Sequence, residues 1–499
     1  MTTVLGPVSR NGQAGQAGSD AAARLRSQLP PPRRSWFARD PSWPITVTLV
    51  GWPVWWYLGI VENHIFLLMA IPMLVRMNRW SRREGRKIKL PPGFGLWILF
   101  MIVSAAGFFT LGLQAPGTLK SATGTVFFSS ISRLLDYGGA FVFLVYAGNL
   151  TERELPRRRL AWLLGLVGLY CVAGGFLGIV DPHFQLTSPL THLLPARLQG
   201  LAAVNPGSAQ NMATLGYTVG RVKAPFAYTN VWGNCLAITL PWLVVAWRSY
   251  RTARWQPWAV DVVLLLTIIP TVISLDRGLW VGIAFTVLYL GVRFAMMGRF
   301  ALIGALIGTV AVVGVLIVAS PIGTLIQQRE ANGKSNDIRS STTSIAVKDG
   351  LASPIIGYGD SRRMEGGTNS ITTGRSSTCK KCGNSEVGTS GQGQLLMVTS
   401  GVVGVITYSA FFLYGIWRYR RDRSPYGLCG VLVLLLGFVF FPVYTATGPP
   451  DGFMMLAYAI LWKNDREMSR RAPPPPATTA RPALQGRNGR AAITGGLLT

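Results

Sequence analysis

The chain has 499 residues, of which 49% are apolar and only 14% are charged, and its mean hydropathy is +0.34. Soluble domains carry about 25% charged residues, so the composition excludes an ordinary soluble domain. The formal net charge of +28 suggests nucleic-acid binding. However, the arginines cluster in short loops between apolar runs, where anionic lipids and the positive-inside rule account for them. The sequence therefore predicts a polytopic membrane protein with membrane lipids, and no nucleic acid, among its partners.

Residues 1–40 and 466–499 are polar and rich in Gly, Ala, Pro and Arg, which predicts two disordered tails around a membrane domain at 41–465. The first forty residues lack the apolar core of a cleavable signal peptide. Twelve apolar runs follow in the membrane domain, the first, second and last being short: 45–59, 64–77, 93–113, 131–150, 160–180, 229–247, 258–274, 278–294, 300–320, 394–417, 426–444 and 452–462. We expect an all-α transmembrane bundle of about twelve spans.

The loops between these runs alternate in charge. Every even-numbered span exits into a segment with several Arg or Lys residues, whereas the exits at 61–63, 114–125 and 445–451 are poor in them. This alternation predicts a multi-pass membrane protein with both termini in the cytoplasm. The long segments 181–228 and 321–393 are then outer loops. The second, a large extracytoplasmic loop between spans nine and ten, is long enough to be a catalytic or binding element.

Asp276 and Arg277 lie between the seventh and eighth spans, on the predicted outer side. Ionised groups at the level of the membrane are costly and usually mark a working site. The planar guanidinium group suits phosphate oxygens, and further outer-face arginines include Arg221 and Arg339. A single arginine in a loop is better explained by an ion pair with a neighbouring acidic residue or with a lipid headgroup. For Arg277, held between two spans, we favour a functional role.

Several short motifs then occur in a set order. The stretch from Lys223 to Ala237 runs into Leu240-Pro241, and Ser274-Leu-Asp-Arg-Gly-Leu-Trp280 follows. Arg339 precedes Ser353-Pro-Ile-Ile-Gly-Tyr-Gly359, and the large loop ends in Gln392–Leu396 and Gly401-Val-Val-Gly404 as it runs into the tenth span. In order and spacing this resembles the O-antigen ligase and O-antigen polymerase-like membrane glycosyltransferases, over about residues 200–420.

The resemblance implies an inverting glycosyltransferase that needs no metal and no cofactor. Its donor would be a glycan on undecaprenyl diphosphate at the outer face of the bacterial cytoplasmic membrane, and its acceptor a glycan or lipid. Arg277 and Arg339 would bind the diphosphate and stabilise the leaving group electrostatically. Arg221 and Lys223 are second candidates for the same anion, and Asn230 is a further substrate-binding candidate within the first motif.

The chain departs from this family at the end of the large loop, where ligases usually carry His-Asn and this chain has Gly391-Gln-Gly-Gln394. Gln392 and Gln394 have the chemistry to orient a hydroxyl group but cannot take its proton near neutral pH. The carboxylates of Asp276, Asp360 and Glu365 can take this proton. For Asp276, a salt bridge that orients Arg277 is an equally good interpretation.

Two functions are alternatives to a glycosyltransferase. A transporter or flippase for a lipid-linked sugar would also place charge in the membrane, but it should show two related halves and discontinuous helices near the midplane. The predicted polar features instead gather at one face, which favours surface chemistry. A non-catalytic scaffold leaves Arg277 unexplained.

Cys379 and Cys382 lie in the predicted outer loop, two residues apart. A zinc site needs about four ligands, and only these two outer cysteines are placed to contribute, so we expect a disulfide outside the cell. Alkylation of the mature protein should label neither thiol until a reductant is added. Ready labelling of both without reductant would refute the bridge. Changing either cysteine to Ser should affect the order of the loop rather than the chemistry.

Overall fold

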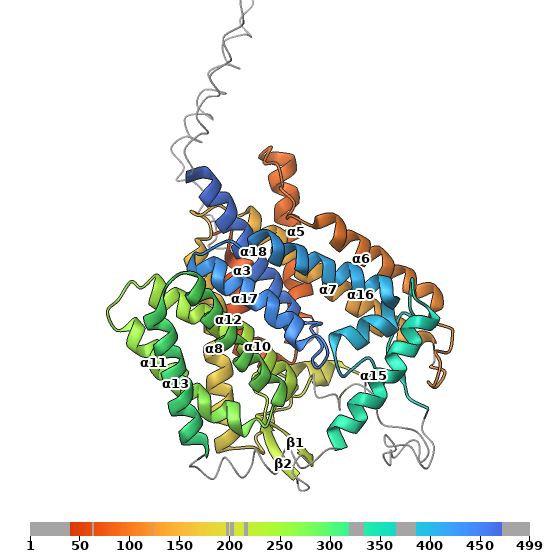
Figure 1. Cartoon of the computed structure of the whole chain (residues 1–499). Coiled ribbons are helices and arrows are strands. Elements are labelled where there is room, and N and C mark those ends of the chain that lie inside the picture. The colour runs from red at the N-terminus through yellow and green to blue at the C-terminus, as the bar shows by residue number, and fades with distance from the viewer. Residues whose placement is uncertain are drawn as a thin grey trace, which may run out of the picture.

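The computed structural model describes residues 40–61, 64–121, 123–195, 199, 204–213, 218–318, 334–365 and 386–471. Both predicted tails, apart from residue 40 and residues 466–471, and the Cys379–Cys382 pair lie outside this part. The described chain is mostly helical, which confirms the all-α class (Figure 1). Six helices are long and apolar enough to cross a membrane: Val126–Asn149, Arg157–Val180, Thr229–Ser249, Gln256–Ile273, Arg277–Met296 and Gln392–Tyr419.

With one exception, the helices follow the predicted apolar runs in chain order. They are α3 (Trp43–Val50), α4 (Trp52–Leu58), α5 (Ile65–Arg83), α6 (Phe94–Ala106) with the short 3-10 helix η1 (Gly107–Thr110), α7 (Thr123–Asn149), α8 (Arg157–Val180), α10 (Thr229–Val244), α11 (Gln256–Ile273), α12 (Arg277–Met296), α13 (Phe300–Val318), α15 (Lys334–Ala352), α16 (Gln392–Tyr419), α17 (Pro425–Phe440) and α18 (Pro449–Arg471). The exception is α15, which lies within the segment 321–393 that was predicted to be a loop. The first run is divided into α3 and α4, and Pro53 lies just after the break at Gly51.

The last helix occupies the centre of the bundle. Every residue of α18 from Phe453 to Trp462 is buried, because α7, α10 and α17 pack around it. The shortest apolar run in the sequence therefore forms a fully enclosed stretch of helix. Its polar continuation to Arg471 emerges at one end of the molecule (Figure 1).

The basic loops meet at that same end. Arg86, after α5, forms an ion pair with Glu154, after α7, with 2.9 Å between Nη1 and Oε1. Arg158 donates to Thr252, beyond α10, at 2.8 Å, and Arg293 at the end of α12 donates to the Asp422 carbonyl, beyond α16, at 2.7 Å. Lys463 in α18 donates to the Leu155 carbonyl at 2.6 Å. The exits of the even-numbered spans thus share one end of the bundle.

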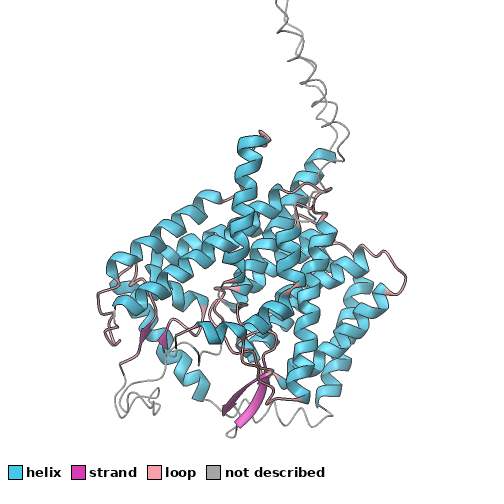
Figure 2. Ribbon diagram, turned by 180° about the vertical axis from the view of Figure 1, so that it is seen from behind, coloured by secondary structure: helices cyan, strands magenta, loops and turns pink. Residues whose placement is uncertain are grey.

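The segments predicted to be outer lie at the opposite end. They include a hairpin in which β1 (Ala209–Ala213) pairs antiparallel with β2 (Thr218–Val222), with Gln210 opposite Arg221. The other short pair, β3 (Arg362–Arg363) with β4 (Glu386–Val387), connects the two described parts of the large loop. Figure 2 shows one strand pair projecting below the helices and the other, shorter pair at the side of the bundle. They do not change the all-α class.

Residues 354–359 of the large loop hydrogen-bond to α16 where that helix is interrupted. Gly401 has φ 65° and ψ −169°, which interrupts the helix. The residues after α15 supply partners for the backbone groups that the break releases: Tyr358 N donates to Val398 O at 2.7 Å, and Gly359 N to Thr399 O at 3.0 Å. Val403 N donates to Pro354 O at 3.0 Å. Non-helical backbone at membrane depth is tolerated only when its polar groups are paired in this way.

Gly357 is predicted to be essential for this junction. It has φ +63°, and a Cβ there would stand 2.6 Å from the backbone nitrogens of Ser400 and Gly401. Gly357→Ala should therefore lower the free energy of unfolding by about 3 kcal/mol, through left-handed strain and overpacking. Thermal unfolding in detergent measures this. Gly308→Ala on α13, where an added methyl group would meet no atom of the described chain within 4 Å, is the control and should not destabilise the protein. Equal stability of the two variants would contradict the proposed packing role.

Candidate functional site

The junction between α11 and α12 places Asp276 and Arg277 at the end of the bundle that carries the hairpin. Arg277 is the first residue of α12 and is half-buried, whereas Asp276 is buried. Leu275, immediately before them, has φ 51°, a left-handed conformation that costs a non-glycine residue about 1–2 kcal/mol. Strain of this kind persists where the surrounding structure enforces it, and it is often found at functional sites.

The Asp276 carboxylate has two different oxygen environments. Oδ1 accepts a short hydrogen bond from the Tyr444 hydroxyl, in the loop after α17. Oδ2 has no hydrogen-bond partner among the described residues, although it is buried. Gly278 of the Asp-Arg-Gly motif lies directly against the Tyr444 hydroxyl, so any side chain at position 278 would displace this contact.

Two arginines from distant segments, Arg221 and Arg339, act electrostatically on this carboxylate. Arg221 of β2 is buried, and its Nε donates to the Ser274 carbonyl at 2.7 Å. Burial lowers the pKa of Arg221 below its ordinary value; the negative charge of Asp276 opposes this, and repulsion from Arg339 and Arg277 adds to it. Arg339 of α15 also acts electrostatically on Asp276 and Tyr444. Its half-buried guanidinium makes no hydrogen bond or ion pair within the described part of the chain.

This geometry brings together four of the predicted site residues. Arg221 and Arg339 act on the carboxylate of Asp276, and Arg277, the next residue in the chain, repels Arg221, so three positively charged groups gather near one carboxylate within the described part of the chain. Tyr444 completes the group, and sequence reasoning missed it, because a tyrosine at the end of an apolar run is usually an interfacial aromatic residue. We call Asp276, Arg221, Arg277, Arg339 and Tyr444 the arginine site.

The other predicted residues flank the arginine site. Lys223 is buried just beyond β2, and Asn230 is half-buried in the first turn of α10. Gln392 is buried at the start of α16, where its Nε2 donates to the Tyr137 hydroxyl at 2.8 Å and its Oε1 accepts from Ala446 N at 2.8 Å. These contacts give Gln392 a structural role; its role in substrate binding stays a prediction. Gln394 donates to Thr343 of α15.

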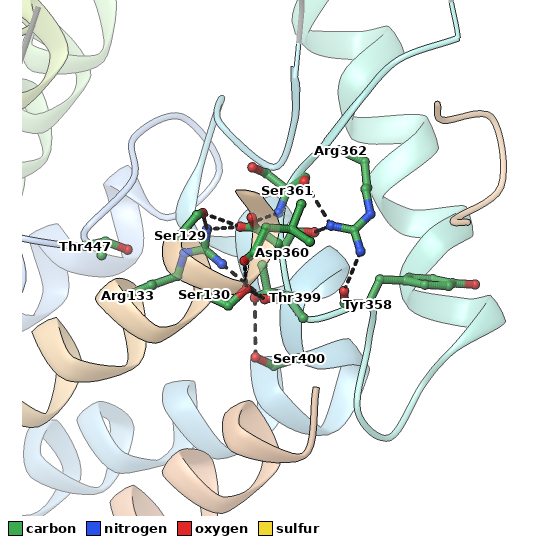
Figure 3. Close-up of polar contacts among 12 residues, drawn as sticks. Ser129, Ser130, Arg133, Tyr358, Asp360, Ser361, Arg362, Thr399, Ser400 and Thr447 are labelled. Atoms are coloured by element: carbon green, nitrogen blue, oxygen red, sulfur yellow. Dashed lines mark hydrogen bonds and ion pairs between the residues drawn. The ribbon is translucent and has the colours of Figure 1, made fainter. Parts of the chain in front are cut away.

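A second polar cluster joins the large loop to α7 (Figure 3). Arg133 of α7 forms a short ion pair with Asp360, which also accepts from the Ser129 hydroxyl at 2.8 Å and from Ser361 N at 2.9 Å. Arg362 is buried beside it and donates to the Leu111 and Tyr358 carbonyls at 3.0 and 2.9 Å. Asp360, one of three carboxylates considered as a base, is therefore engaged in holding the loop. Glu365 is exposed.

Sequence reasoning also passed over ionisable residues inside the fourth span. Arg133 and Asp136 both lie in Val126–Asn149. Asp136 is buried and interacts electrostatically with Asp451 of α18, whose Oδ1 accepts from Tyr408 at 3.2 Å and whose Oδ2 has no partner among the described residues. The signal was present in the sequence, because charged residues within a span are rare and usually functional.

No family model and no curated protein matches this chain. Membership of the O-antigen ligase and polymerase family stays a prediction from the sequence motifs. Within the described residues, no group of three or more His, Cys, Asp or Glu side chains is arranged to hold a metal ion.

Asp349 lies on α15, the helix that carries Arg339, and interacts electrostatically with Arg362 of the second polar cluster. Its side chain is fully buried, and neither carboxylate oxygen has a hydrogen-bond partner among the described residues. Burial raises the pKa of Asp349 from its usual 3.8 to about 7, against the attraction of the nearby Arg362 charge. Near neutral pH this position therefore changes charge state.

Asp349→Asn is expected to flatten the dependence of stability on pH. With a pKa of about 7 instead of 3.8, the folded protein keeps a proton that the unfolded chain releases, so native stability should fall as pH rises between these values. The Asp349→Asn variant should lose this fall and be more stable than the native protein at a pH of about 8. Thermal unfolding in detergent at a pH of about 5 and of about 8 tests this, with Glu365→Gln, at an exposed carboxylate, as control. Parallel pH curves for the native protein and the Asp349→Asn variant would contradict it.

Proposed function

We propose that the protein is a membrane glycosyltransferase that ligates or polymerises a polyprenyl-diphosphate-linked glycan at the outer face of the bacterial cytoplasmic membrane. The observation that carries the proposal is the gathering of positively charged groups at the arginine site. The guanidinium groups of Arg221 on β2 and Arg339 on α15 act on the carboxylate of Asp276, and that of Arg277 at the start of α12 repels Arg221. The guanidinium group of Arg339 has no hydrogen-bond or ion-pair partner among the described residues. Guanidinium groups bind phosphate oxygens in a bidentate fashion.

The location of the arginine site suits a lipid-linked donor. It lies at one end of a bundle of membrane-length helices, opposite the end where the basic loops meet. Under the positive-inside rule the basic end is cytoplasmic, so the proposed topology has about twelve spans, with cytoplasmic termini and the arginine site outside. A diphosphate could then bind the arginines while its polyprenyl chain stays in the bilayer.

In this mechanism the arginines stabilise the negative charge that develops on the lipid diphosphate as the glycosidic bond breaks. Arg277 and Arg339 bind the diphosphate, and Arg221 holds the hairpin against the junction through Ser274 while adding positive charge. Asp276 is the carboxylate best placed to accept the proton of the incoming hydroxyl group, through Oδ2, which lacks a partner among the described residues. Tyr444 fixes the orientation of that carboxylate.

One observation favours the alternative of a lipid-linked sugar transporter. Discontinuous helices are typical of transporters, and α16 is interrupted at Gly401. However, the backbone groups released by that break are bonded to residues 354–359 and do not line a binding site for an ion. The two functions differ in their products, because only a transferase releases the lipid diphosphate from its glycan.

Arg277→Ala should reduce glycan transfer by about a hundredfold or more, because losing a charge-assisted contact to a developing anion in a partly desolvated site costs on the order of 3 kcal/mol. Arg339→Ala should behave similarly. Arg277→Lys should recover little, since a point charge does not reproduce the guanidinium fork. Release of lipid diphosphate by purified protein from a lipid-diphosphate-linked glycan measures turnover.

The matched control is Arg363→Ala, which removes an exposed arginine from the same end of the molecule, paired only loosely with Glu386 at 3.8 Å. It should retain near-native turnover, and chelators should have no effect on any variant. Near-native turnover by Arg277→Ala would overturn the assignment. Movement of the intact donor across vesicles without release of lipid diphosphate would support the transporter.

A further inference from the structure

The helix that carries Arg339 also exposes apolar side chains where its contacts with the protein end. Val347 and Leu351, one helical turn apart on α15, are 39% and 65% exposed, and Ile355 in the following turn is 64% exposed. Large apolar side chains at a spacing of four residues form one row on a helix surface. We call these three residues the α15 stripe.

The position of the α15 stripe along the bundle follows from the anchor in α16. Residues 358 and 359, just beyond the stripe, hydrogen-bond to Val398 and Thr399. Thr399 lies about seven residues into α16, about 10 Å along the helix axis. Gln392–Tyr419 is one of the helices long and apolar enough to cross a membrane. The anchor therefore lies within a candidate membrane span and not at its outer end.

The α15 stripe is also next to a surface of membrane-facing character. Gly107 of η1 lies directly against the Ile356 carbonyl and Gly359, and Gly117 packs on Ile345. On this neighbouring segment Phe109 is exposed, as are Leu113 and, on α6, Ile102. In Figure 1, α15 lies at the periphery of the bundle, with α16 on its inner side. An apolar surface thus runs from α6 across η1 to α15.

From these observations we infer that the end of α15, from Val347 on, and the turn after it are inserted into one leaflet of the bilayer, with Val347, Leu351 and Ile355 in contact with lipid acyl chains. The large loop is then partly a re-entrant membrane segment, and not wholly an extracytoplasmic one. Lys348 is exposed beside the stripe, and its long side chain can extend to the headgroups while its methylene groups remain among the chains. Asp349 faces the protein interior. The inference rests on α16 crossing a membrane and is independent of the proposed catalysis.

Spin labels measure this contact. The five cysteines are replaced by Ser, and single cysteines are introduced by Leu351→Cys, by Ile102→Cys as the lipid-facing reference and by Ser344→Cys, a position nearer the start of α15, as the water-facing reference. The full chain is reconstituted into nanodiscs of phosphatidylethanolamine and phosphatidylglycerol. The label at 351 should be several-fold more accessible to oxygen than to a water-soluble nickel chelate, as at 102, and the label at 344 should show the reverse.

Nickel access at 351 equal to that at 344 would overturn the inference, because the stripe would then face water. Low access to both reagents, with spin–spin broadening that grows with the number of chains per nanodisc, would also overturn it and identify a second copy as the occupant. If the cysteine-free chain does not fold, a benzophenone amino acid at 351 in the otherwise native chain decides the question. Photo-adducts with phospholipid support insertion, and adducts only with protein contradict it.

Discussion

Asp276 is a carboxylate removed from water between two membrane-length helices, and its charge is acceptable only because cations surround it. Removing an ion from water costs several kcal/mol unless opposite charge and hydrogen bonds replace the lost solvation. Here the replacements come from a hairpin, from the start of α12, from α15 and from the loop before α18. Four segments far apart in the chain are thus held at one end of the bundle by one buried charge.

Like charges are concentrated at this site. Repulsion from Arg339 and Arg277 contributes to the lowered pKa of Arg221. Concentrating like charges in a folded protein lowers its stability, and such sites are commonly functional. By contrast, Arg133 and Asp360 neutralise each other's charge. Serine hydroxyl and backbone groups beside them complete the hydrogen bonding, as expected of a structural contact (Figure 3).

Much of the helical order was predictable, because apolar runs and basic loops carry physical constraints that act locally. Arg277 was identified for the same reason: a charge between two spans is unusual in any context. Its convergence with Arg339 was inferred only through family resemblance, since no local pattern shows which distant segments meet. Tyr444 gave no signal at all, because its importance depends on Asp276 lying opposite it. Arg133 and Asp136 did give a signal, within an otherwise apolar run, and it was overlooked. The break at Gly401 was also hidden, since a glycine in a long apolar run is compatible with an unbroken helix.

The enclosure of α18 has a consequence for the order of assembly. This helix follows all the other described helices in the chain, yet α7, α10 and α17 cover it on several sides. During synthesis the earlier helices enter the bilayer without their central partner, and the space for α18 must be filled by lipid or closed loosely until it arrives. Tyr444 and the loop after α17 reach Asp276 only when α17 and α18 take their places. The buried carboxylate therefore acquires its hydrogen bond at the last stage of maturation, so that the site and the closed bundle are completed together.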